Sequence, residues 1–224
     1  MATEMISASV QDYAKAVYAL ETRGEGNVST SDLAERLGVS PASASGMVRK
    51  LAELGLAEHE PYHGVRLTPA GKRVALEVLR HHRLLELFLA EALGMPWDRV
   101  HDEAEVLEHV LSEDLEELIA VRLGNPTLDP HGDPIPSVEL EIDEGHTLSL
   151  DELEVGATGR FMRVSDSDPE MLRYLEHQGI APGARFEVLE RQPFGGPSLV
   201  RFGEIEQAIG GDLARAMRMQ VDSR

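Results

Sequence analysis

The texture of the sequence changes once, and that change limits what the chain can fold into. Up to about Leu123 the apolar residues recur every three or four positions, as on one face of a helix. Residues 124–137 then hold four prolines and two glycines, which interrupt helices. From about Leu148 onward, short segments with partial alternation are separated by turns rich in Gly and Pro. The sequence therefore predicts a mainly α-helical chain followed by a small β-barrel or sandwich.

The N-terminal part carries a pattern typical of a helix-turn-helix. Helices are expected at residues 9–21 and 32–37, the second ended by Gly38. Ser40 and Pro41 fit the N-cap and first position of a third helix running to about Leu54. Extended segments at 56–60 and 65–67 flank a turn and predict a wing. The apolar residues expected in this core are Ala34, Leu37, Val39, Ala44, Val48 and Leu51.

The charge distribution allows this end of the chain to approach DNA. The net charge is −19, but residues 1–74 hold eight Lys or Arg and nine Asp or Glu, a net of −1. No acidic residue lies between Arg36 and Ala52, and the outward positions of the third helix are short or basic, which suits a major groove. The predicted DNA-binding residues are Ser40, Pro41, Ala42, Ser43, Gly46, Arg49 and Lys50, with Arg66 in the wing. The alternative is a three-helix protein-interaction module.

Histidines and carboxylates gather in the segment 101–109. If a helix capped by Asp98 continues to about Leu111, then His101, Glu105, Glu108 and His109 lie along one stripe. His82 and Glu86 are four residues apart on the preceding helix, expected over 68–93. Oxygen ligands with a minority of imidazoles suit manganese or ferrous iron better than zinc or copper. The alternative is a solvated acidic helix face.

Several classes of protein are disfavoured. The chain has no cysteine, which excludes disulfides and thiolate metal sites. No apolar run approaches the ~20 residues of a membrane span, and no signal peptide opens the chain, so we expect a cytoplasmic protein with no membrane partner. The HExxH pattern and nucleophile motifs are absent, so we expect no enzyme. A catalytic metal site remains the rival interpretation, which a turnover screen with manganese would test.

With these features the chain resembles the iron- and manganese-dependent repressors related to the diphtheria toxin repressor and the manganese transport regulator. The resemblance covers nearly the whole chain. It is carried by Asp12-Tyr13, residues 29–56, 81–86 and 101–109, and the loop 129–136. It implies a homodimeric repressor that binds double-stranded operator DNA when loaded with metal. It also implies a winged helix domain (1–74), a helical dimerisation and metal-binding domain (75–145) and an SH3-like domain (146–224).

The resemblance also implies two metal sites. The regulatory site corresponds to Asp12, Glu105, Glu108 and His109. The second site corresponds to His82, Glu86 and His101 and is completed by residues of the C-terminal domain. The candidates there are Asp166, Asp168 and Glu170, of which we predict Asp168 and Glu170 as ligands.

Two departures from the family pattern bear on the choice of metal. Iron-responsive members have Met and Cys in place of Asp12 and Glu105, and two carboxylates favour Mn(2+), with Fe(2+) as the alternative. Lys15 stands where shorter manganese regulators have a further glutamate, so their two-metal arrangement is not expected here.

Overall fold

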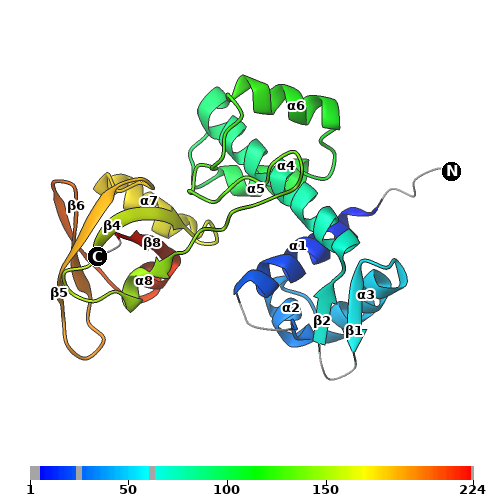
Figure 1. Cartoon of the computed structure of the whole chain (residues 1–224), viewed down its shortest axis with the longest axis horizontal. Helices are drawn as coiled ribbons and strands as arrows, with labels where there is room; N and C mark the ends of the chain where they lie inside the picture. Colours follow the sequence, from blue (N-terminus) through cyan, green and yellow to red (C-terminus); the bar gives the residue numbers. More distant parts are fainter. Residues whose placement is uncertain (1–5, 24–26, 61–63, 223–224) are drawn as a thin grey trace. The chain divides into compact units, whose positions relative to one another are not determined.

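The computed structural model describes residues 6–23, 27–60 and 64–222 (Figure 1). The chain divides into two compact units. The first holds the chain up to His82 together with Leu107–Ser112 and Pro136–Glu141; the second holds Arg83–Val106, Glu113–Ile135 and everything from Ile142 onward. Because each unit combines segments that are distant in sequence, this division does not test the predicted domain boundaries.

The first unit contains the predicted winged helix-turn-helix. Three helices, α1 (Ala8–Arg23), α2 (Thr30–Arg36) and α3 (Pro41–Glu53), precede the antiparallel pair β1 (Ala57–Glu60) and β2 (Gly64–Leu67). The Ser40 hydroxyl accepts the Ser43 N–H at 3.2 Å and Pro41 takes the first turn, so α3 begins where the sequence predicts. The tip of the wing, residues 61–63, lies outside the described residues.

The core of this domain follows the apolar period of its helices. Val10, Tyr13 and Val17 of α1 are buried, and they pack with residues of α2, α3 and the wing. Of the six residues predicted for the core, Ala34, Ala44, Val48 and Leu51 are buried and Leu37 is partly buried. Val39 is 36% exposed, so its prediction is wrong: it lies in the turn between α2 and α3, held by a backbone bond to the Ala34 carbonyl rather than by packing.

Three further helices follow, α4 (Pro69–Leu93), α5 (Val100–Leu107) and α6 (Glu113–Arg122). The helix expected to continue to Leu111 ends at Leu107, because the Val110 N–H bonds the Leu107 carbonyl at 3.1 Å and closes a turn. His101 and Glu105 are therefore helical whereas Glu108 and His109 are not, and the predicted single stripe is wrong. In the described part of the chain, no helix has the length and apolar character needed to cross a membrane.

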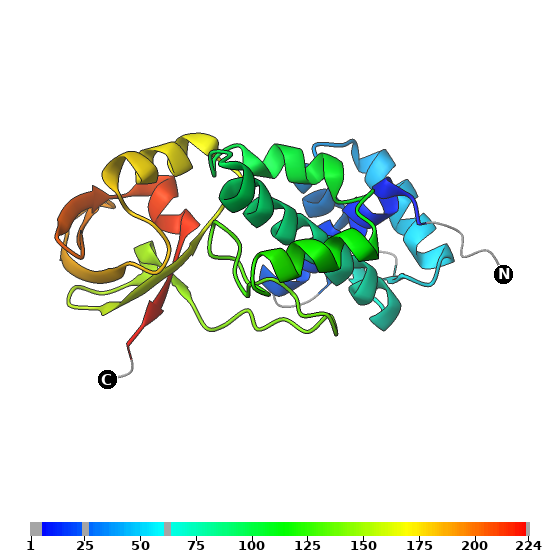
Figure 2. The same ribbon diagram turned by 90° about the horizontal axis from the view of Figure 1, so that it is seen from above.

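The C-terminal part is a six-stranded antiparallel sheet in the order β3-β8-β4-β5-β6-β7. Its strands are β3 (Leu148–Ser149), β4 (Thr158–Val164), β5 (Arg185–Arg191), β6 (Ser198–Phe202), β7 (Ile205–Ile209) and β8 (Met217–Val221). Two helices, α7 (Pro169–Gln178) and α8 (Gly211–Ala216), lie next to each other beside the curved sheet (Figure 2). Phe161, Leu172 and Met219 are among the buried residues of its core. The predicted fold class is confirmed.

Candidate metal centre and DNA-reading face

The first compact unit brings three of the predicted ligands together. Asp12 of α1 meets Glu108 and His109 from the turn after α5, with one ligand atom from each within 4.8 Å of the others. His109 Nε2 lies 2.9 Å from Asp12 Oδ1 and 3.6 Å from Glu108 Oε1. His109 Nδ1 donates to Gln11 Oε1 at 2.7 Å, which leaves Nε2 as the nitrogen that faces the carboxylates. We call Asp12, Glu108 and His109 the first cluster.

The Glu108 carboxylate of the first cluster is fully buried between two nitrogen groups. Its Oε1 accepts a hydrogen bond from the Lys15 ammonium at 2.6 Å, and its Oε2 lies 2.5 Å from His82 Nδ1. His82, predicted for the second site, therefore lies beside a ligand of the first in this unit. Glu105, predicted for the first site, belongs to the other unit, where its carboxylate is 3.9 Å from His101 Nε2.

A second cluster lies within the second compact unit and is organised around Glu86 of α4. Glu86 Oε1 lies 3.3 Å from His101 Nδ1, and Asp166, just after β4, lies 3.0 Å from the same nitrogen. On its other side Glu86 Oε2 lies 3.8 Å from His131 Nδ1, and Asp129 is close to both residues. We call Glu86, His101, Asp129, His131 and Asp166 the second cluster.

His131 is oriented so that one ring nitrogen faces Glu86. Its Nε2–H donates to the Trp97 carbonyl at 2.8 Å, and its ring stacks on the Trp97 indole with 5.7 Å between centroids. Across the described ranges 6–23, 27–60 and 64–222, nothing hydrogen-bonds to His131 Nδ1, although this side chain is fully buried. The 3.8 Å gap to Glu86 exceeds a hydrogen bond, but fits two bonds of roughly 2 Å to one cation. The second cluster therefore fits a divalent metal ion.

The loop that presents His131 is fixed by its own backbone. Asp129 Oδ1 accepts the N–H groups of His131 and Asp133, at 2.8 and 2.9 Å. Gly132 has φ +87°, and a Cβ at this position would lie 2.0 Å from the Met162 carbonyl oxygen. The loop can therefore take this path only with glycine at 132, which keeps His131 turned inward.

The charges of the second cluster are balanced by its histidines. Asp166 and Glu86 raise the pKa of His101 to about 10. Burial lowers the pKa of His131, but Glu86, Asp129 and the Trp97 carbonyl together outweigh it and raise the pKa to about 9. Burial raises the pKa of Asp129. Around neutral pH both imidazoles are thus protonated in the metal-free protein, and a metal ion has to replace those protons.

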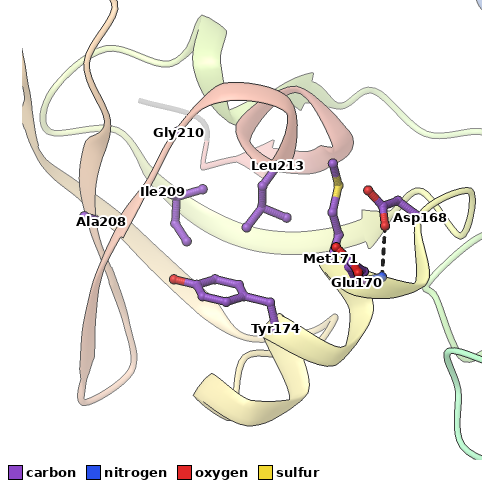
Figure 3. Close-up of a pocket in the computed structure, with 8 residues that line it drawn as sticks. All are labelled: Asp168, Glu170, Met171, Tyr174, Ala208, Ile209, Gly210 and Leu213. Carbon is purple, nitrogen blue, oxygen red and sulfur yellow. Dashed lines mark hydrogen bonds between the residues drawn. The ribbon is translucent and has the colours of Figure 1, made fainter.

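Asp168 and Glu170, the residues predicted to complete the second site, lie elsewhere in the C-terminal domain. Asp168 Oδ1 accepts the Glu170 N–H at 2.9 Å and caps α7. Both residues line an open hollow of about 360 Å³ with Tyr174 of α7 and Leu213 of α8 (Figure 3). Neither shares a candidate metal cluster within the described residues, whereas Asp166 does. The sequence does not predict Asp129 and His131 as ligands, because the loop 129–136 supports the family resemblance but shows no ligand spacing of its own.

The predicted DNA-binding residues lie on the outer side of α3 and the wing. Ser40, Pro41, Ala42, Ser43, Arg49, Lys50 and Arg66 are all exposed. Gly46 is half-buried, and apart from its own helix backbone and its chain neighbours no atom of the described residues lies within 4 Å of where its Cβ would be. Arg66 is opposite Glu58 in the β-hairpin. The arrangement leaves the backbone of α3 open to close approach from outside.

Comparison with protein families gives matches over most of the chain. Residues 5–65 match the N-terminal DNA-binding domain of iron-dependent repressors, and residues 68–137 match their metal-binding and dimerisation domain. Residues 148–221 match the FeoA domain.

Individual relatives have the same extent as this chain. The iron-dependent repressor IdeR of Mycobacterium tuberculosis is 32% identical over 220 residues, which covers 93% of this chain and 95% of the relative. A manganese-dependent transcriptional repressor solved in complex with manganese is 43% identical, with a TM-score of 0.89 over 95% of this chain and 99% of that one. The manganese regulator SloR is 30% identical, with a TM-score of 0.78 over 95% and 98%.

Proposed function

The chain belongs to the family of iron-dependent repressors, which are metal-dependent DNA-binding proteins rather than enzymes, and on that premise we propose that this member responds to manganese. The observation that carries the proposal is the chemistry of the two clusters. Both consist of carboxylates and imidazoles, and the chain has no cysteine to supply a thiolate. Such oxygen-rich sets favour Mn(2+) over softer ions.

In this proposal one ion binds at the first cluster, held by Asp12, Glu108 and His109. An ion also binds at the second cluster, where Glu86 belongs to two sets of ligands, one with His101 and Asp166 and the other with Asp129 and His131. Glu105 and His82 remain predicted contributors. Asp168 and Glu170 are no longer proposed as ligands, because Asp168 caps α7 and both line the hollow beside it. A bound ion supplies the positive charge that lets buried carboxylates approach each other.

The first cluster links the DNA-reading domain to a segment that is distant in the sequence. Asp12 lies on α1, which packs in the core with α2 and α3, whereas Glu108 and His109 follow α5. We propose that ligation fixes the position of α1, so that two α3 helices of a dimer adopt the spacing of successive major grooves, about 34 Å. Without metal, other spacings become populated.

The dimer contact is proposed at α6. Members of this family dimerise, and the matched dimerisation domain includes this helix. Leu115, Leu118 and Val121 of α6 are exposed by 49, 66 and 61%, at helical spacing on one face. An exposed apolar stripe of this kind is typical of a surface buried against a second copy.

The experiment that tests the function is DNA binding with and without metal. A duplex selected from a randomised pool in the presence of manganese should bind tightly with Mn(2+) and lose its affinity after chelation. Equal affinity after exhaustive chelation would end the proposal. Titration with Mn(2+) and Fe(2+) under anaerobic conditions decides between manganese and the alternative, a ferrous-iron-dependent repressor.

Metal binding at the second cluster can be followed separately. Trp97 is the only tryptophan of the chain, and it stacks on His131. Ligation of His131 should therefore change the intrinsic fluorescence, whereas the Asp12→Ala variant should keep that change and lose metal-dependent DNA binding. If Asp12→Ala bound DNA with unchanged metal dependence, the proposed link through α1 would be wrong.

A further inference from the structure

Lys15 is a charged residue that the proposed function does not use. It lies on α1, one turn after Asp12, and its side chain is 16% exposed. Its ammonium donates to Glu108 Oε1 at 2.6 Å, and the Glu108 side chain is fully buried. A buried carboxylate needs a positive partner, and in the metal-free protein Lys15 is one.

The oxygen that Lys15 holds is the one that faces the rest of the first cluster. Glu108 Oε1 lies 3.6 Å from His109 Nε2, which in turn lies 2.9 Å from Asp12 Oδ1. The other oxygen, Oε2, is engaged by His82 Nδ1 at 2.5 Å. A divalent ion held by Asp12, Glu108 and His109 therefore meets the ammonium at the same carboxylate oxygen. Two cations in a poorly solvated place repel each other strongly.

We propose that Lys15 is a resident cation of the first cluster, which holds Glu108 in place without metal and competes with the divalent ion for it. The inference rests on the proposed metal site. Through this competition Lys15 raises the metal concentration needed for activation. Removing its charge should tighten metal binding and, at the same time, destabilise the metal-free protein.

The test compares Lys15→Met, which keeps the aliphatic stem, with Lys15→Arg, which keeps the charge. Calorimetric titration of the full chain with manganese should show tighter binding at the first cluster in Lys15→Met, by tenfold or more, and near wild-type binding in Lys15→Arg. Thermal melting without metal should show Lys15→Met unfolding at a lower temperature than Lys15→Arg. Trp97 fluorescence, which follows the second cluster, should respond equally in both.

The outcomes separate this inference from the proposed function. If the wild-type chain takes up no manganese at the first cluster, the proposed site fails, yet the melting comparison still measures the Lys15–Glu108 pair. If Lys15→Met binds manganese no more tightly than the wild type, or melts without metal at the same temperature, competition by Lys15 is refuted. Should Lys15→Met not fold without metal, recovery of the folded state by manganese supports the inference, and no recovery in either Lys15→Met or Lys15→Gln overturns it.

Discussion

Replacing Gly46 with alanine should make the protein more stable and a weaker DNA binder. Gly46 lies inside α3, where the backbone is helical, and in the described part of the chain no atom beyond the local helix backbone and the two neighbouring residues lies within 4 Å of the new methyl group. Alanine is favoured over glycine in a helix interior by about 0.5–1 kcal/mol, because less backbone entropy is lost on folding. The free energy of unfolding should rise by that amount, as measured by denaturant titration of the metal-free protein.

The same methyl group should obstruct the approach of α3 to the duplex. If the helix backbone sits deep in the major groove, a Cβ at position 46 overfills the interface, and overpacking of this kind typically costs about 1–3 kcal/mol. That range corresponds to roughly 5- to 150-fold weaker binding. The assay is fluorescence anisotropy with the selected duplex at fixed salt and saturating manganese, since phosphate contacts make such affinities depend on salt.

The control is the opposite change on the same exposed side, Ala42→Gly. It should lower the stability, as glycine is the poorer helix former, without adding an atom to the interface. If Gly46→Ala were more stable than the wild type and bound the duplex equally well, α3 would not approach DNA as closely as we propose.

Four further predictions concern the metal-binding residues and the dimer. Because Asp166 and Glu86 raise the pKa of His101 to about 10, and Glu86 and Asp129 raise the pKa of His131 to about 9, manganese should release protons near pH 7.5 and bind more tightly as pH rises. Calorimetry in buffers of different ionisation enthalpy counts the released protons. The folding stability of the metal-free protein should change with pH in the opposite direction. The raised pKa values of His101 and His131 stabilise the folded state fully below about pH 6.5, and this stabilisation is lost as the pH rises through 9 to 10. Thermal melting at a series of pH values will show the loss. Leu118→Glu should shift the dimer to monomer in sedimentation experiments, since it places a charge in the apolar face of α6, and a persistent dimer would move the contact elsewhere. Asp12→Met combined with Glu105→Cys should shift activation of DNA binding toward ferrous iron, and an unchanged preference would argue against ligand softness as its cause.

The winged helix could be read from the sequence because its signals are local. The Ser40–Pro41 start of α3 and the 3.6-residue period of its core residues depend on residues a few positions apart. Strand β7 and helix α8 were not predicted, because both are short, with five and six residues. The end of α5 at Leu107 was missed for a different reason. No proline or glycine marks it, and one backbone bond from Val110 decides it.

Local sequence patterns could not predict the complete second cluster, because its members come from four separate segments. Glu86 lies on α4, His101 on α5, Asp129 and His131 in the loop before the sheet, and Asp166 after β4. Position along the chain favoured Asp168 and Glu170 as much as Asp166. Only the fold distinguishes them, because Asp168 is used to cap α7 and Asp166 points to His101.

Both clusters contain buried carboxylates whose negative charge needs a positive partner, but the partner differs between them. Metal binding at the two clusters therefore depends on different variables. In the second cluster the positive charges are protons on His101 and His131, which can leave into solvent when a metal ligates the same nitrogens. In the first cluster a positive charge belongs to Lys15, which is attached to α1 and has to move away as a whole side chain. Metal binding at the second cluster is therefore coupled to pH. Metal binding at the first cluster is coupled to the position of the Lys15 side chain on α1, a helix of the DNA-reading domain. We therefore expect the metal dependence of DNA binding to be determined mainly by the first cluster. The second cluster determines how much metal the protein already holds when the first cluster binds its ion.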